Sequence, residues 1–140
     1  MLLKIALSTI FIIFTHSAHA LWVKIEPCDL LSSSDLIVEG IYLGSSTIQL
    51  NAQPQAVNLG VIKVNKIIKG RYADIVFIQQ TLPTSLTNSS DISYKTGQGG
   101  IWFLTRSNLH TNGIYLANDP QRFWSLKQSA KFNSIIDNCK

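Results

Sequence analysis

Side chains able to perform acid–base or nucleophilic chemistry are scarce in this chain. Histidine occurs three times, and His16 and His19 both lie in an apolar N-terminal segment. His110 lies in a polar, loop-like segment, where a lone histidine is most often a solvated residue. It is the only candidate base for a Ser-His-Asp triad, and no serine has the Gly-x-Ser-x-Gly surroundings of a nucleophile elbow. The sequence therefore favours a protein that is not an enzyme over an enzyme centred on His110.

The acidic residues form no recognisable catalytic pair. The chain has two glutamates, Glu26 and Glu39, and six aspartates that fall mostly at turns or at the ends of expected elements. Hydrolysis by two carboxyl groups needs them about 5 to 9.5 Å apart, and no spacing here indicates such a pair. The sequence therefore predicts no catalytic site, no metal site and no cofactor.

Two short motifs suggest functions that their surroundings do not support. The run GQGG at 97–100 precedes an expected strand rather than a helix, and no Gly-Lys-Ser/Thr follows it. Backbone freedom at a barrel corner explains this run better than phosphate binding does. Asn88 begins a formal N-glycosylation sequence, which matters only in a eukaryotic host.

The two cysteines, Cys28 and Cys139, lie far apart in the chain. Neither belongs to a Cys-x-x-Cys motif or stands beside a histidine, so the sequence indicates neither zinc binding nor redox catalysis. In an oxidising compartment an isolated pair is most simply a disulfide; the alternative is two free, buried thiols. The loop-entropy model assigns such a bond about 4 to 5 kcal/mol of stabilisation.

Aromatic and arginine side chains concentrate in the last third of the chain, and they are the remaining functional lead. Adjacent residues of a strand point to opposite faces, so either Trp102 or Phe103 needs cover from outside the core. The segment 123–124 and a C-terminal helix could supply that cover. The alternative is an exposed patch that binds a protein. The candidate members of that patch are Trp102, Arg106, Tyr115, Arg122 and Trp124.

Alternating apolar and β-branched residues predict five strands joined by polar turns. The strands are expected at 36–43, 57–68, 74–79, 101–105 and 114–117. Other segments are expected as a turn or short helix cap (32–35), a weak strand or loop (45–55) and a long loop (81–96). Gly40 indicates a bulge or strong curvature, and Ser125 is a candidate N-cap for a helix from 126 to about 137. These elements predict a mainly β fold, a small five-stranded barrel, closed or partly open, with a C-terminal helix.

The first twenty residues have the features of a cleavable secretory signal peptide. Lys4 supplies a basic start, residues 5–14 are almost wholly apolar, and Ala18-His19-Ala20 offers small residues at the cleavage site. Leu21 would then begin a 120-residue single domain, 21–140, that is periplasmic or secreted. The alternative is an uncleaved anchor, although the run is shorter than the roughly 20 apolar residues that span a bilayer. We expect no stable membrane insertion after cleavage.

Composition and charge limit the classes of function. The chain is 46% hydrophobic and 14% charged, which excludes a disordered, solvated chain. Its formal net charge is +4, of which Lys4 supplies one. Because the basic residues are spread along the sequence, no nucleic-acid partner is predicted.

Three segments carry a resemblance to a known family. They are 34–40 (SDLIVEG), 62–70 (IKVNKIIKG) and 97–104 (GQGGIWFL). Their order resembles that of bacterial secreted proteins of the TIMP-like/netrin-like OB-fold type, and the resemblance implies an OB-like five-stranded barrel. In the animal inhibitors of that superfamily, a cysteine at the mature N-terminus chelates the zinc of a protease. This chain departs from that pattern, because Leu21 rather than Cys28 is the expected first residue.

Together these patterns predict a non-enzymatic, exported small β-barrel that binds a protein or another component of the cell envelope. A protease inhibitor of the TIMP-like type is the alternative. The two hypotheses differ in the terminus they need, since only cleavage before Cys28 would expose a cysteine amino group.

Overall fold

The structure is a computed structural model that describes residues 23–51, 55–82, 92–109, 113–117 and 119–139. The expected signal segment, Asn88 and His110 lie outside the described residues, as does most of the expected loop 81–96.

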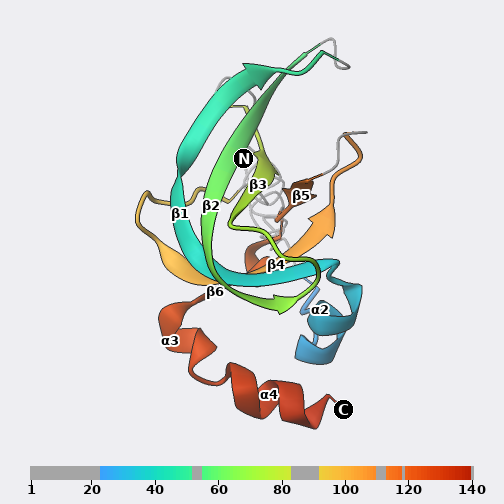
Figure 1. The fold of residues 1–140 in the computed structure, drawn as a ribbon. Helices are drawn as coiled ribbons and strands as arrows, with labels where there is room; N and C mark the ends of the chain where they lie inside the picture. Colours follow the sequence, from blue (N-terminus) through green and yellow to red (C-terminus); the bar gives the residue numbers. More distant parts are fainter. Residues whose placement is uncertain (1–22, 52–54, 83–91, 110–112, 118, 140) are drawn as a thin grey trace, which may run out of the picture.

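One six-stranded sheet forms the body of the protein (Figure 1). Its strands are β1 (Leu36–Gln49), β2 (Ala56–Lys69), β3 (Ile75–Gln80), β4 (Gly99–Arg106), β5 (Ile114–Leu116) and β6 (Phe123–Ser125). Five of them form a ring in the order β1-β2-β3-β5-β4, because β4 pairs back onto β1. The β3–β5 pair is parallel and the other pairs are antiparallel. The prediction of a mainly β, five-stranded, barrel-like fold is confirmed, and the short β6 adds a sixth strand beside β4.

The hairpin of β1 and β2 extends further than the sequence predicts. Each strand has 14 residues, and their pairing continues as far as Gln49 opposite Ala56. The polar end of β1 is a strand because its backbone groups pair with β2, a long-range requirement that side-chain patterns do not reveal. The register shifts between Glu39 and Gly40, as the expected bulge requires. A Cβ atom at Gly40 would clash with the carbonyl oxygen of Lys63, so this close approach needs glycine.

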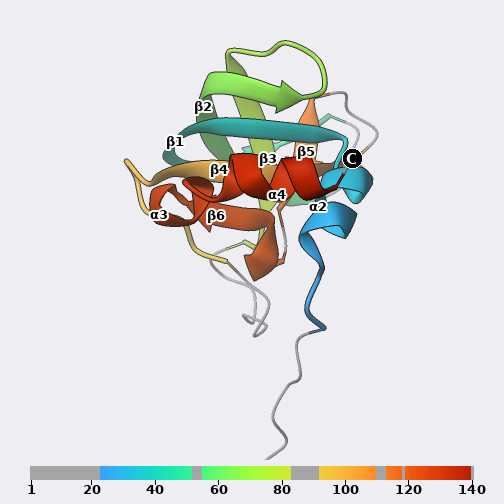
Figure 2. The same ribbon diagram turned by 90° about the horizontal axis from the view of Figure 1, so that it is seen from below.

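In the part of the chain that the structure describes, four short helical segments accompany the sheet. They are α2 (Pro27–Ser33), η1 (Pro120–Arg122), α3 (Leu126–Ser129) and α4 (Phe132–Asn138). Figures 1 and 2 show α2, α3 and α4 gathered at one end of the ring. The sequence predicts only a turn or cap near α2, yet Pro27 starts a helix there because proline suits the first helical turn. Within the described ranges, no helix is long and apolar enough to cross a membrane.

The C-terminal helix, expected in one piece over 126–137, is divided in two. Its predicted start is confirmed, because Gln128 Oε1 accepts a hydrogen bond from the backbone N–H of Ser125 at 2.9 Å. The N–H of Lys131 then bonds to the carbonyl of Gln128, three residues back, at 3.1 Å. This tighter turn separates α3 from α4, and Phe132 at the start of α4 is buried in the core.

The strand β4 divides the core into two clusters. Trp102 and Leu104 join the cluster inside the ring, whereas Ile101 and Phe103 join the cluster that packs against the helices. All four side chains are at most 2% exposed. A strand with apolar residues on both faces is stable here because both faces are covered.

Candidate functional site

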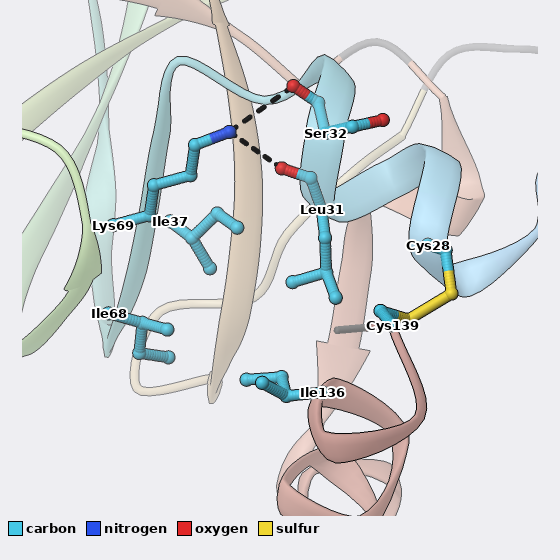
Figure 3. Close-up of a pocket in the computed structure, with 8 residues that line it drawn as sticks. All are labelled: Cys28, Leu31, Ser32, Ile37, Ile68, Lys69, Ile136 and Cys139. Carbon is cyan, nitrogen blue, oxygen red and sulfur yellow. Dashed lines mark hydrogen bonds between the residues drawn. A yellow bond between two sulfur atoms is a disulfide. The ribbon is translucent and has the colours of Figure 1, made fainter.

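Cys28 and Cys139 form a disulfide, which confirms the pairing that the sequence predicts. The bond joins α2 to the residue that follows α4 and closes a loop across 111 positions of the chain. Beside it lies a hollow of about 370 Å³ (Figure 3). The hollow is lined by Cys28, Leu31, Ser32, Ile37, Ile68, Lys69, Ile136 and Cys139.

The single charged group of this hollow already has a structural partner. Lys69 Nζ donates to the carbonyl oxygens of Leu31 at 2.7 Å and of Ser32 at 3.2 Å (Figure 3). Both carbonyls belong to the last turn of α2, where a cation is favourable because the helix dipole is negative there. The remaining lining is apolar apart from Ser32. We therefore interpret this place as the joint between the helices and the sheet.

Trp102, the first member of the predicted aromatic patch, lies in the core. Its side chain is 0% exposed, and its ring centroid lies 4.8 Å from that of Phe123 and 6.0 Å from that of Tyr94. Trp102 is therefore the residue of the pair that faces the core inside the ring, and it cannot contribute to a surface patch. Cover by the segment 123–124 and the C-terminal helix applies to Phe103, which packs against Trp124 and Phe132.

Trp124 covers the opposite face of β4. Its ring centroid lies 5.1 Å from that of Phe103 and 5.9 Å from that of Phe132. The pairing register places Phe123 opposite Trp102 on β4, so successive residues of β6 cover successive residues of that strand. Both faces of β4 are thus covered from within the chain.

The remaining members of the predicted patch lie at separate places in the sheet. Arg106 is exposed and sits opposite Tyr115 in the β4–β5 register. Arg122 reaches the hydroxyl oxygen of Ser34 and the carbonyl oxygen of Phe103, each at 3.5 Å. These two arginines and Tyr115 therefore do not form one exposed surface with the two tryptophans.

Exposed apolar side chains also lie on the outside of β1, β2 and β3, which we call the outer face. Its exposed apolar residues are Leu43, Ile75 and Phe77, and the half-buried Ile41 and Val61 and the exposed Lys63 complete it. The register places Val61 opposite Phe77, and Lys63 opposite both Ile75 and Ile41. Directly paired residues share one face of a sheet. Leu43 is 47% exposed, Ile75 is 50% exposed and Phe77 is 42% exposed.

In the described ranges no helix covers the outer face. The helices α2, α3 and α4 pack at one end of the ring, against β4, β6, one another and the ends of β1 and β2 near Ile37 and Ile68. These residues are not among the predicted patch, although one feature of the sequence indicates them. The run Ile75-Val76-Phe77-Ile78 is apolar on both strand faces, which requires either cover on both sides or an exposed apolar face.

A second hollow, of about 350 Å³, lies where β2 begins and β3 ends. Its lining includes four amide side chains, and we call it the amide pocket. They are Gln55, Asn58, Gln79 and Gln80. Asn58 is only 6% exposed and sits directly opposite Gln80 in the β2–β3 register.

The titratable groups do not gather into a reactive centre. In the part of the chain that the structure describes, no group of three or more His, Cys, Asp or Glu residues could hold a metal ion. The pKa of the Tyr94 phenol is raised, chiefly by its burial against Trp102 and Phe123. The pKa of Tyr72 is raised by its hydrogen bond to Asp74, on the exposed turn that follows β2.

Comparison of the chain with models of protein families, with curated proteins and with solved structures finds no match.

Proposed function

We propose that the protein is a non-enzymatic binding module whose outer face takes a protein partner. The observation that carries the proposal is the exposure of Ile75 and Phe77, which pair with Lys63 and Val61 on the outside of the sheet, together with the exposed Leu43 at the neighbouring bulge of β1. Outward positions of an antiparallel sheet are ordinarily polar. A contiguous apolar surface on a folded domain is typical of an interaction site.

The charge around the outer face favours an acidic partner. Lys63 lies within the face and Arg71 follows on the turn after the same strand, whereas Lys66 sits opposite Glu39 in the β1–β2 register. Lys63 and Arg71 are exposed, and neither forms an ion pair among the described residues. Unpaired cations at the edge of an apolar surface attract acidic groups and accelerate association.

The place of action that we propose is the periplasm or the cell exterior, where the partner would be a protein of the envelope. The disulfide supports a non-reducing compartment. The features of residues 1–20 support export, and the resemblance to secreted TIMP-like proteins is compatible with it.

The proposal can be tested by photo-crosslinking from the outer face. A benzoylphenylalanine at position 77 keeps an aromatic ring there, and the matched control carries it at position 126, where Leu126 is 58% exposed away from the outer face. We expect an adduct with an envelope protein from position 77 alone. Equal labelling from both positions, or no labelling from position 77, would refute the proposal.

The identified partner then allows a quantitative test. Replacing a central aromatic residue of an interface commonly costs 1 to 2 kcal/mol or more, so Phe77→Gln should weaken binding about tenfold. Leu126→Gln, which removes an apolar side chain of similar exposure elsewhere, should leave the affinity unchanged. Lys63→Glu should slow association, and this effect should decrease as salt is added. An affinity that Phe77→Gln does not change would refute the assignment of the outer face.

A further inference from the structure

The hollow beside the Cys28–Cys139 disulfide stays open although two helices and two strands meet around it. We call it the disulfide hollow. Its volume of about 370 Å³ lies at the lower end of the range of ligand sites, roughly 300 to 1,000 Å³. It lies with α2 and α4 at one end of the ring (Figures 1 and 2), and none of its lining residues belongs to the outer face. The hollow is therefore a second surface, separate from the outer face.

Aliphatic side chains converge on the disulfide hollow from four elements (Figure 3). They are Leu31 of α2, Ile37 of β1, Ile68 of β2 and Ile136 of α4. All four belong to, or pack against, the core cluster that faces the helices. Ile37 is completely buried, whereas the other three are half-buried. An apolar ligand would remove the exposed part of this surface from water, which is the main driving force for binding at an apolar site.

A β-bulge in β2 brings a positive charge to this apolar wall. Ile37 on β1 pairs with Lys69. The next residue, Val38, pairs with Ile67, which leaves Ile68 as the extra residue of the bulge. Adjacent residues of a regular strand point to opposite faces, whereas a bulge redirects a side chain. Figure 3 shows the side chains of both Ile68 and Lys69 at the hollow.

The ammonium group of Lys69 is held in place without an opposite charge. Its two hydrogen bonds go to the carbonyl oxygens of Leu31 and Ser32, which are dipoles and carry no net charge. A lysine ammonium has three donors, so one N–H remains. Lys69 is exposed, and within the described residues it forms no salt bridge. A fixed cation with a remaining donor is suited to bind an anionic group.

The lining also limits the class of ligand. Ser32 is the other polar side chain of the hollow, and its hydroxyl already donates to the carbonyl oxygen of Asp29 at 3.2 Å. The described lining therefore offers one cation beside aliphatic and disulfide surface. Such a surface suits an alkyl chain with one anionic head, whereas a sugar or a nucleotide needs several polar partners. The small volume favours one chain of medium length over a two-chain lipid.

We propose that the disulfide hollow binds a free fatty acid of medium chain length. The alkyl chain lies on Leu31, Ile68 and Ile136, and the carboxylate accepts a hydrogen bond from the ammonium group of Lys69. The site is independent of the outer face, so either proposal can fail without the other.

The test is an NMR titration of the full chain with isotope-labelled methyl groups. The probes are octanoate, 1-octanol and octylamine, which share one alkyl chain and differ in the charge of the head. We expect the methyl signals of Leu31, Ile68 and Ile136 to shift with octanoate at a Kd of about 1 mM or below, and more weakly with the other two probes. The methyl signals of Leu43 and Ile75, which are exposed on the outer face, serve as the control for unspecific apolar binding. No shift in the hollow at about 3 mM octanoate, equal shifts on the outer face, or equal affinity for 1-octanol would overturn the proposal.

Matched variants test the role of the charge. Lys69→Gln keeps N–H donors but removes the charge, so it should weaken octanoate binding by about fivefold, as expected for one ionic contact at a partly open site, and leave 1-octanol binding unchanged. Lys69→Arg keeps the charge and should retain the preference for octanoate. Lys66→Gln removes an exposed cation of the same strand outside the hollow and should leave all affinities unchanged. A preference for octanoate that persists in Lys69→Gln, or equal weakening by Lys69→Gln and Lys66→Gln, would overturn the proposal.

Discussion

Removal of the Cys28–Cys139 disulfide should lower the free energy of unfolding more than any other change on the surface of this protein. The bond constrains the unfolded chain across 111 positions. In the chain-entropy model, a constant term plus the logarithm of this loop length gives about 4.8 kcal/mol at 25 °C. A single domain is typically stable by only about 5 to 15 kcal/mol, so this loss would be a large fraction of the total.

The perturbation is the double substitution Cys28→Ser and Cys139→Ser, which changes two side chains at the edge of the protein. Guanidinium unfolding of the oxidised protein, the reduced protein and the double variant gives the three free energies. We expect the reduced protein and the variant to agree and to lie several kcal/mol below the oxidised protein. Hydrogen exchange in α4 should also accelerate, because the bond ties that helix to α2. A variant within about 1 kcal/mol of the oxidised protein would refute the loop-closure argument.

Three further measurements test the core, the backbone and the ionisation of the fold. Phe103→Ala should lower the free energy of unfolding by about 3 to 5 kcal/mol. Leu126→Ala, at a side chain that is 58% exposed, should change it by less than about 0.5 kcal/mol. Equal effects of the two variants in denaturant unfolding would contradict the burial of Phe103. Gly100→Ala should prevent β6 from pairing, because the new Cβ would press against the backbone of Trp124. Gly97→Ala meets no atom within 4 Å and should lower the free energy of unfolding only by the roughly 1 to 2 kcal/mol that a positive φ costs. Thermal unfolding followed by circular dichroism would contradict this if Gly97→Ala destabilised the protein more than Gly100→Ala. Burial raises the pKa of Tyr94 above its unfolded value of 10.0, so the stability that the neutral phenol contributes is complete below pH 10 and is lost as the pH rises further. Ultraviolet titration should show a tyrosine transition above pH 10 that Tyr94→Phe removes. A titration curve in which this substitution leaves the high-pH transition unchanged would be inconsistent with burial.

The local elements of the fold could be predicted from the sequence because strands, turns and caps depend on neighbouring residues. Alternation and β-branched residues locate β2 and β3 to within one or two positions. The bulge at Gly40 and the cap at Ser125 follow from residue type alone. The polar end of β1 could not be predicted, because its pairing with β2 determines its structure. The prediction of a turn near α2 overlooks Pro27, whose type favours the first turn of a helix.

The sequence by itself showed which segments are apolar enough to form core strands, that the only two cysteines could pair with each other, and that few residues could perform acid–base or nucleophilic catalysis. It could not decide which aromatic residues reach the surface. Trp102 and Phe77 both lie in apolar strands, yet Trp102 faces the inside of the ring, whereas Phe77 faces outward and no helix of the described ranges crosses it. Cover is a property of long-range packing, and the order of strands around the ring sets it. The tertiary structure alone therefore placed the outer face on β1–β3, and it alone brought Asn58 and Gln80 together at the end of the ring.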